Sequence, residues 1–285
     1  MNVLITGGSG FIGGYVYRYL KMNKYHVKNF DIIGNDQDPD FIHGSITDFD
    51  KVKRAVYDSD IIFHFAGFSN INNVKEKPLE CIDLNIMGTA NLLEAIRLKG
   101  EGKLIIASSV YVHNSQGHLY TTSKAAAERI CEDYSTLYNI PTTIIRLGTV
   151  YGEYSRHEDV ISIFVKKICK GENICIHGDG KQKRNFIHGD DVAYACEKIL
   201  IHNVYGKNLI LSGNKETTIN QLVKILKQVN PSIQVSYSTE LARENDYQGD
   251  IGNLEETYSL LNWRPSIDIS QGINRLKKHF CKSRC

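Results

Sequence analysis

The chain has 285 residues, 42% of them hydrophobic and 23% charged, which is typical of a folded globular protein of one or two domains. Its formal net charge of +2 provides no strong field for nucleic acid or an anionic membrane, so neither is expected as a partner. No run of 18 apolar residues is present, and a strand-like segment follows Met1-Asn2 directly. We therefore expect a cytoplasmic protein with no membrane span and no signal peptide.

The seven cysteines are an odd number, and their spacing matches neither a metal site nor a disulfide framework. We therefore expect reduced thiols, in agreement with a cytoplasmic location, and no bound metal.

The first half of the chain alternates short apolar segments with helical patterns. Strands are predicted at residues 3–5, 26–31, 61–65, 103–107 and 142–146, and a long helix at residues 123–138. Apolar strands that alternate with helices are typical of a parallel sheet covered on both faces. The predicted fold class is therefore α/β, with a doubly wound parallel (Rossmann) sheet.

A glycine-rich turn separates the first strand from the first helix, with glycines at Gly7, Gly10 and Gly13. Small residues there let the backbone approach a pyrophosphate, whose charge is stabilised by the helix N-terminus. Asp31 ends the second strand, where a carboxylate can accept hydrogen bonds from the adenine ribose. Two isoleucines follow it, and no arginine is present for a 2′-phosphate. NAD is therefore predicted in preference to NADP.

Tyr120 and Lys124 stand four residues apart, which places both side chains on one face of the long helix. A lysine ammonium beside a phenol favours the phenolate, so we expect it to lower the tyrosine pKa from about 10. Such a tyrosine can exchange a proton with a substrate hydroxyl while hydride moves to or from the cofactor. Ser108 or Ser109, at the end of the fourth strand, can hydrogen-bond the reacting oxygen. The combination predicts a redox enzyme.

The character of the sequence changes after about Tyr151, where glycine-rich turns and shorter elements follow. We expect an NAD-binding Rossmann domain over residues 1–151, rejoined by about residues 186–212. Residues 152–285 are expected to form a smaller C-terminal α/β lobe for the substrate. Because ligands of doubly wound sheets bind beyond the carboxyl ends of the strands, such a lobe is expected to cover the site.

Together these motifs resemble the extended short-chain dehydrogenase/reductase family, specifically its nucleotide-sugar epimerases and dehydratases. The resemblance covers nearly the whole chain. Beyond the glycine turn and the Tyr/Lys pair, it includes the segments HFAG (64–67), NIMGTAN (85–91), RLGTVYG (146–152), GDGKQKRNFIH (178–188) and LNWRP (261–265).

The resemblance implies a role for each matching position. The cofactor would be held at its pyrophosphate by Gly7, Gly10, Phe11, Ile12 and Gly13, at its ribose by Asp31, beside its adenine by Ser45 and Ile46, and along its nicotinamide half by Phe65, Ala66 and Gly67. The catalytic residues would be Ser109, Tyr120 and Lys124, the last two also contacting the cofactor. The nucleotide-diphosphate sugar would be bound by Thr149, Arg184 and Arg243.

The sequence departs from the family pattern in four places, one of them Thr149, where many relatives carry a substrate-binding asparagine. Ser45 stands where an aspartate is usual. Val110 and Tyr111 replace the Asp-Glu pair that follows the catalytic threonine in relatives that eliminate water, so dehydration lacks its proton carriers. Only eleven positions separate Ser109 from Tyr120, fewer than is usual in the family, and the shortened segment normally borders the sugar.

We therefore predict an NAD-dependent nucleotide-sugar epimerase that acts at C4 through a transient keto sugar. A nucleotide-sugar 4,6-dehydratase, a keto-sugar reductase and, more remotely, a non-catalytic dinucleotide-binding regulator are the alternatives. The family resemblance also implies a homodimer, for which residues 86–99 and 123–138 are the candidate interface helices.

Overall fold

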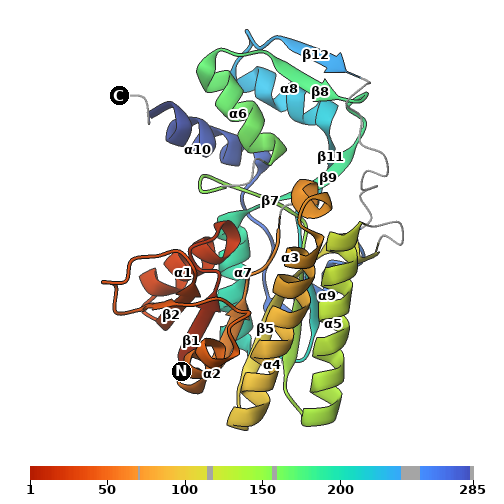
Figure 1. Cartoon of the computed structure of the whole chain (residues 1–285). Helices are drawn as coiled ribbons and strands as arrows, with labels where there is room; N and C mark the ends of the chain where they lie inside the picture. The colour runs from red at the N-terminus through yellow and green to blue at the C-terminus, as the bar shows by residue number, and fades with distance from the viewer. Residues whose placement is uncertain (70, 114–117, 156–158, 239–250, 283–285) are drawn as a thin grey trace.

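The computed structural model describes residues 1–69, 71–113, 118–155, 159–238 and 251–282 (Figure 1). Its centre is a seven-stranded sheet in the order β10-β6-β5-β4-β1-β2-β3, in which every pair of neighbours is parallel. The strands are β1 (Asn2–Thr6), β2 (His26–Asp31), β3 (Phe41–His43), β4 (Ile61–His64), β5 (Lys103–Ser109), β6 (Thr142–Leu147) and β10 (Asn208–Leu211). The predicted doubly wound α/β sheet is confirmed.

Helices cover both faces of this sheet, because alternate strand residues point to opposite sides. In β1, Val3 and Ile5 pack into one core and Leu4 into the other. The first core lies under α1 (Phe11–Met22), α7 (Gly189–His202) and α9 (Glu255–Leu261). The second lies under α2 (Phe49–Tyr57), α4 (Gly88–Lys99) and α5 (Leu119–Tyr138). Short helical turns connect these elements, namely η1 (Ile71–Lys75), α3 (Pro78–Ile82), η2 (Asp83–Met87) and η3 (Val110–His113).

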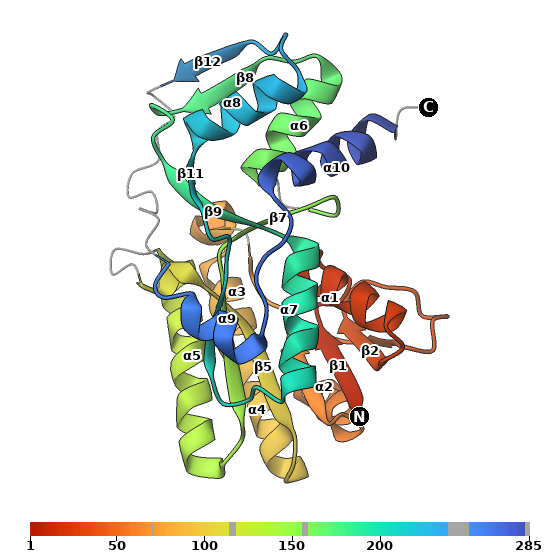
Figure 2. The same ribbon diagram turned by 180° about the vertical axis from the view of Figure 1, so that it is seen from behind.

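A smaller lobe lies beyond the carboxyl ends of the sheet strands (Figure 2). It contains the three-stranded sheet β11-β9-β7 and the strand pair β12-β8. Its elements are β7 (Thr149–Tyr151), β8 (Ile174–His177), β9 (Lys183–His188), β11 (Glu216–Thr218), β12 (Val235–Ser238), α6 (Val160–Lys170), α8 (Ile219–Val229) and α10 (Ile269–Lys282). Tyr151, Phe164, Leu222 and Ile273 belong to the lobe's own hydrophobic core.

The cysteines differ from the expectation of reduced thiols. Cys169 on α6 and Cys281 on α10 form a disulfide, with their Cα atoms 5.5 Å apart. They stand 112 residues apart in the sequence, so no local spacing marks them as a pair, and only the packing of α10 on α6 brings them together. The expectation is therefore wrong for these two residues, and the cytoplasmic location stays a prediction. No helix in the described ranges has the length and apolar character to cross a bilayer.

Replacing both bridged cysteines (Cys169→Ser with Cys281→Ser) is expected to lower the free energy of unfolding by about 2–4 kcal/mol. The cross-link closes a long loop and thereby lowers the entropy of the unfolded chain. Urea denaturation of the oxidised proteins measures the difference. Cys175→Ser, which removes a free thiol of the same lobe, is the control. Equal midpoints for the double variant and the wild type would contradict the prediction.

Candidate active site

In the turn between β1 and α1 the backbone packs closely against itself, because glycines stand where a Cβ would collide with a neighbouring backbone atom. A Cβ on Gly13 would lie 2.3 Å from the carbonyl oxygen of Gly7, and one on Gly7, whose φ is +76°, would lie 2.5 Å from the amide nitrogen of Ala66. The Gly10 amide donates to the Gly7 carbonyl at 2.9 Å, and α1 begins directly afterwards at Phe11. Because the first N–H groups of a helix have no acceptor within it, those of Phe11 and the next two residues suit a pyrophosphate.

Asp31 lies beside this turn, at the carboxyl end of β2. Its Oδ2 accepts a hydrogen bond from the Ser9 amide at 3.0 Å, and its Oδ1 accepts one from the Ile33 amide at 3.2 Å. These bonds orient the carboxylate, and each oxygen keeps acceptor capacity for a ribose hydroxyl. A fixed carboxylate at this point also disfavours the 2′-phosphate of NADP by charge repulsion.

Ser45 and Ile46 lie at the same edge, just beyond β3. Gly44 donates its amide to the Asp31 carbonyl at 3.0 Å, which holds this segment next to the end of β2. The hydroxyls of Ser45 and Thr47 are 2.8 Å apart, and the buried Ile46 belongs to the core under α4. The segment that carries both residues therefore begins beside Asp31, and their contact with adenine stays a prediction.

The loop after β4 lies between the glycine turn and α5. The amides of Phe65 and Ala66 both donate to the Thr6 carbonyl at 3.0 Å. A Cβ on Gly67, whose φ is +154°, would lie 3.8 Å from Nζ of Lys124. Residues 65–67, which the family resemblance assigns to the nicotinamide half of NAD, thus lie next to Lys124, one of the predicted catalytic residues.

The three predicted catalytic residues come together at the carboxyl end of β5. Ser109 lies near enough to Tyr120 to lower the pKa of its phenol, and Lys124 donates from Nζ to the Ala107 carbonyl at 3.0 Å. Ser108 points to the opposite side of the strand, and its buried Oγ has no hydrogen-bond partner within the described ranges. Of the two candidate serines, the structure therefore brings only Ser109 to Tyr120.

The expected lowering of the Tyr120 pKa is not observed. Burial raises the pKa of Tyr120 above its usual value, and the nearby Tyr111 and Cys81 raise it further, whereas the hydrogen bond from Ser109 lowers it. Burial also lowers the pKa of Lys124 to about 8, against the opposing effects of Cys81 and Glu128. The expectation that the chain's own groups lower the Tyr120 pKa is therefore wrong. Desolvation disfavours the charged forms of both side chains, the Tyr120 phenolate and the Lys124 ammonium.

The predicted substrate residues belong to the small sheet of the lobe. Thr149 begins β7, and Arg184 lies in β9, where its Nη1 donates to the Lys183 carbonyl at 2.7 Å. β9 pairs with both β7 and β11, so the two residues are on one sheet. Arg243 lies outside the described residues.

Two further residues contact this site and have no role in the sequence-based prediction. Asn85 lies between the loop after β4 and α5, and Ser123 lies on α5 between Tyr120 and Lys124. Asn85 is part of a segment that resembles the family, but its sequence gives no indication of its partners. Only the tertiary structure shows that its carboxamide connects the two halves of the site.

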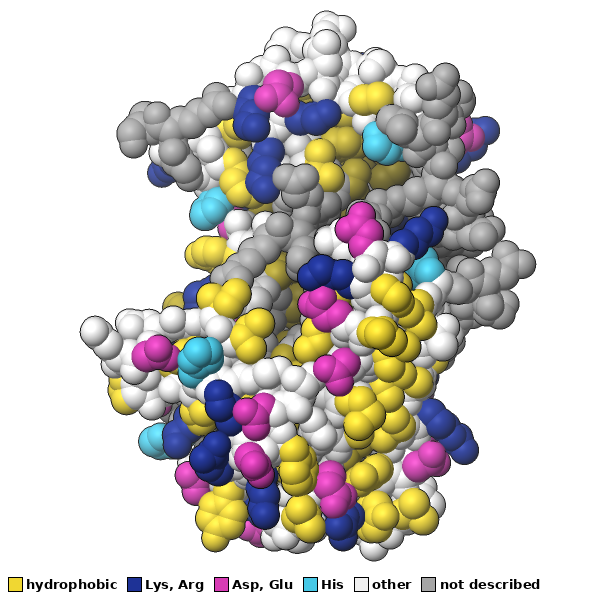
Figure 3. Space-filling view, in the orientation of Figure 1, with side chains coloured by type: hydrophobic (Ala, Val, Ile, Leu, Met, Phe, Trp, Pro, Cys, Tyr) yellow, Lys and Arg dark blue, Asp and Glu magenta, His cyan; other side chains and the backbone are white. Residues whose placement is uncertain are grey.

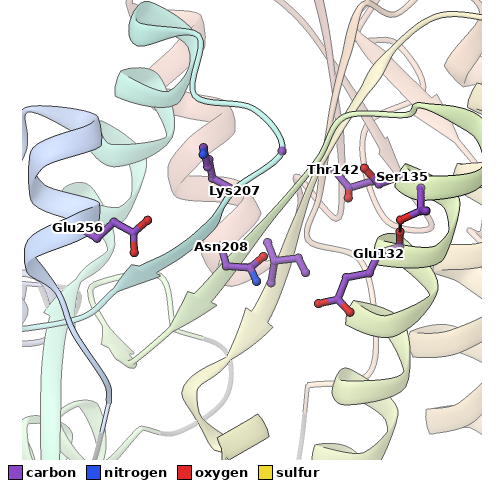
Figure 4. Close-up of a pocket in the computed structure, with 9 residues that line it drawn as sticks. Glu132, Ser135, Thr142, Lys207, Asn208 and Glu256 are labelled. Carbon is purple, nitrogen blue, oxygen red and sulfur yellow. Dashed lines mark hydrogen bonds between the residues drawn. The ribbon is translucent and has the colours of Figure 1, made fainter.

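A cavity of about 490 Å³ lies elsewhere on the molecule (Figure 4). Thr142 and Asn208, the first residues of β6 and β10, line it together with Glu132, Lys207 and Glu256. It is therefore at the amino ends of these parallel strands, the edge opposite to the one where ligands of such sheets bind. We do not assign the chemistry to it.

Comparison with known proteins agrees with this arrangement. The family model described as "NAD dependent epimerase/dehydratase family" matches residues 3–211. The chain belongs to this family. Its cofactor is NAD, for which the glycine turn and Asp31 supply a fitting site.

The names of relatives in this family include both 4-epimerases and 4,6-dehydratases. The chain is 30% identical to a putative UDP-glucose 4-epimerase of Methanocaldococcus jannaschii, with 96% of each chain covered. It is 29% identical to the dTDP-D-glucose 4,6-dehydratase of Mus musculus, over 99% of this chain and 89% of the relative. Among solved structures, the UDP-glucose 4-epimerase of Thermotoga maritima with UDP-glucose is 26% identical and superposes with a TM-score of 0.88, with 99% of both chains covered.

Lys124→Met is expected to stabilise the protein most at low pH. Because the folded-state pKa of Lys124 is lowered from 10.5 to about 8, the unfolded chain binds more protons between these two values. Wild-type stability therefore rises with pH across this window, and the variant lacks that contribution. Its advantage in Tm should be greatest below about pH 8 and should shrink toward pH 10.5.

Melting curves of both proteins from pH 6 to 10.5 test this, with the exposed Lys215→Met as the matched control. A Tm difference for Lys124→Met that stays constant over the whole range would contradict the burial of its ammonium.

Proposed function

We propose that the protein is a nucleotide-sugar epimerase that inverts C4. The observation that carries this proposal is the convergence of Ser109, Tyr120 and Lys124 at the carboxyl end of β5, next to the loop after β4. A phenol at this position can remove a proton from a sugar hydroxyl only if its partners stabilise the phenolate. Ser109 supplies one such hydrogen bond, and Lys124 supplies positive charge whenever it is protonated.

In the proposed mechanism, Tyr120 Oη accepts the proton of the C4 hydroxyl and later returns it to the re-reduced sugar. Once Tyr120 has taken up the proton it no longer needs the single O–H of Ser109, which can then donate to the sugar oxygen and polarise the keto group. A bound NAD would supply a reversible hydride acceptor for C4 of the sugar. Lys124 would hold its nicotinamide ribose, and the charge of the protonated ammonium favours the phenolate.

The residues after Ser109 favour epimerisation over dehydration. Val110 has an aliphatic side chain with no proton to transfer, and it is only 2% exposed and packs against Ile251 in a small apolar cluster. Tyr111 packs at the edge of the same cluster. An elimination at the sugar needs an acid and a base at these places, and the chain provides no carboxylate at either.

The remaining assignments complete the proposal. We infer that residues 1–151, with about residues 186–212, hold NAD and that residues 152–285 hold the nucleotide sugar. Thr149, Arg184 and Arg243 are proposed as its ligands, because arginine forks match the geometry of a diphosphate. The UDP-sugars and dTDP-sugars in the names of the relatives are the first substrates to test.

Tyr120→Phe is expected to reduce turnover by about 10²–10⁴-fold, because the variant cannot accept the sugar proton. NMR of reactions with UDP-glucose, UDP-glucuronic acid and dTDP-glucose detects a C4 epimer of unchanged mass. Tyr134→Phe, on the same helix but with its hydroxyl directed to Glu94, is the matched control and should keep wild-type turnover. A product that has lost water identifies a dehydratase, and undiminished turnover in Tyr120→Phe would overturn the catalytic assignment.

We also propose that two copies of the chain associate through α4 and α5, which lie side by side (Figure 1). Apolar side chains gather on the outer surface of this helix pair (Figure 3). Leu98 on α4 is 48% exposed and Leu137 on α5 68%, and Tyr138 at the end of α5 and Met87 just before α4 are also exposed. Helix faces of this kind are commonly buried by a second subunit.

Light scattering of the wild type at micromolar concentration is expected to give twice the mass of the chain. Leu98→Glu with Leu137→Glu places two charges on the proposed interface and should give a monomer. Met22→Glu, which changes an exposed apolar residue at the end of α1, is the control and should remain a dimer. A monomeric wild type rules the proposal out.

A further inference from the structure

The phenol of Tyr15 joins the helix of the glycine turn to the smaller lobe. Tyr15 lies on α1, two residues after Gly13, and is 4% exposed. Its hydroxyl donates to Oε2 of Glu153 at 2.6 Å and accepts from the Glu153 amide at 2.8 Å. Glu153 stands two residues after the end of β7. One hydroxyl therefore bonds both the side chain and the backbone of the segment that leaves β7, and we call this contact the Tyr15 anchor.

His188 brings β9 to the same carboxylate. It is the last residue of β9 and stands directly before α7, which packs beside α1 (Figure 2). The ring is fully buried, and its Nδ1 accepts from the Asp190 amide at 3.2 Å, so the proton of the neutral ring is on Nε2. That nitrogen lies 3.2 Å from Oε2 of Glu153. The two strands that carry the proposed substrate ligands are thus joined at one carboxylate, at or just beyond their carboxyl ends.

Two glycines make room for the Tyr15 side chain. A Cβ on Gly152 would lie 2.3 Å from the Tyr15 hydroxyl oxygen, and one on Gly189 would lie 2.4 Å from the Tyr15 ring. Further along α1, the Arg18 guanidinium lies over the Tyr154 ring, 3.9 Å from its centroid. The segment after β7 is therefore held along α1 by close packing and a cation–π contact as well as by the Tyr15 anchor.

The two ends of the anchor keep opposite protonation states. Burial disfavours the charge of Glu153, but hydrogen bonds from His188, Tyr15 and its own amide lower the carboxyl pKa from 4.5 to about 2. Burial and the bond to Glu153 raise the pKa of the Tyr15 phenol well above its usual value. An ionised acceptor and a neutral donor therefore coexist over the wide pH range between these two pKa values. The anchor is thus a constant structural contact and not a pH switch.

We propose that Tyr15 is a positioning residue, which fixes the strands of the proposed substrate site relative to the helix that is proposed to hold the cofactor pyrophosphate. The proposal rests on the proposed function, because the nucleotide sugar must meet the nicotinamide across the boundary between the two lobes. β7 carries Thr149 and β9 carries Arg184, each four residues before the residue that meets the anchor.

Loss of the anchor is expected to affect turnover more than cofactor affinity. A shift of β7 and β9 changes the distance between the sugar and the hydride acceptor, and small displacements of reacting groups are costly to reaction rates. The N–H groups at the start of α1 and the carboxylate of Asp31 do not bond the Tyr15 hydroxyl, so NAD affinity should change little.

Two variants of α1 test the proposal. Tyr15→Phe removes the hydroxyl and keeps the ring in its packed position. Tyr19→Phe is the matched control, because Tyr19 lies one turn later on the same helix and its hydroxyl also donates to a carboxylate, Oε2 of Glu197, at 3.1 Å. Glu197 is on α7 in the larger half of the molecule. The control therefore loses a bond of the same kind without loosening the smaller lobe.

Three quantities are measured for each folded variant. They are kcat/KM for whichever of UDP-glucose, UDP-glucuronic acid and dTDP-glucose the wild type turns over, the dissociation constant of NAD by calorimetry, and amide hydrogen exchange at Glu153. For Tyr15→Phe we expect kcat/KM to fall about tenfold or more, NAD affinity to change less than about threefold, and the Glu153 amide to exchange faster. Tyr19→Phe should leave all three within about twofold of the wild type.

The proposal is wrong if folded Tyr15→Phe keeps kcat/KM within about threefold of the wild type, or if its Glu153 exchange is unchanged. It is also wrong if NAD affinity falls as much as kcat/KM, or if Tyr19→Phe lowers kcat/KM equally, because the hydroxyl then acts on the cofactor site or on stability alone. Failure of the proposed function is recognised separately by undiminished turnover in Tyr120→Phe, whereas Glu153 exchange reports on the anchor without any substrate.

If Tyr15→Phe does not fold, Glu153→Gln decides. This variant keeps the shape of the side chain and removes the charge that Tyr15 and His188 bond. It should lower kcat/KM by about threefold or more at unchanged NAD affinity, and an unchanged kcat/KM overturns the proposal.

Discussion

The close contact of the backbone with itself at the turn between β1 and α1 determines where the neighbouring parts of the site lie. Gly13 approaches the Gly7 carbonyl, and Gly7 approaches the Ala66 amide, at distances that no side chain would permit. α1 can therefore begin directly beyond β1, and the loop after β4 can pack against the turn. The free N–H groups of α1, the carboxylate of Asp31 and the loop at residues 65–67 consequently share one edge of the sheet. That edge is where a dinucleotide binds in doubly wound folds.

Burial has opposite effects on the two ionisable groups of the site. It raises the pKa of the Tyr120 phenol and lowers that of Lys124 to about 8, so each group is driven toward its neutral form. A tyrosine in this environment becomes a base only when other groups supply hydrogen bonds or positive charge. The hydrogen bond from Ser109 is the one such contribution that lowers the Tyr120 pKa directly. The proposed chemistry therefore depends on how accurately the neighbouring elements are held.

The smaller lobe has its own core, yet polar contacts fix it to the larger one. The buried carboxylate of Asp191 on α7 accepts hydrogen bonds from the amides of Ser266 and Ile267, at 3.0 Å each, just before α10. Gly272 of α10 lies against the Tyr151 ring, where a Cβ would meet its oxygen at 2.1 Å. The disulfide then holds α10 on α6. The residues proposed to bind substrate in the lobe are thereby positioned by contacts that begin on the larger half of the molecule.

The sequence by itself determined the fold class, the glycine turn with Asp31, and the spacing of Tyr120 and Lys124. These features depend on local periodicity and on residue types that a strand, a turn or a helix requires at neighbouring positions. The tertiary structure alone decided which serine meets Tyr120, because the side chains of consecutive strand residues point to opposite faces. It also decided the pairing of Cys169 with Cys281 and the bonds of Asn85, since their partners lie far away in the sequence. The direction of the Tyr120 pKa shift belongs with these features, because desolvation depends on how the whole chain packs around a group.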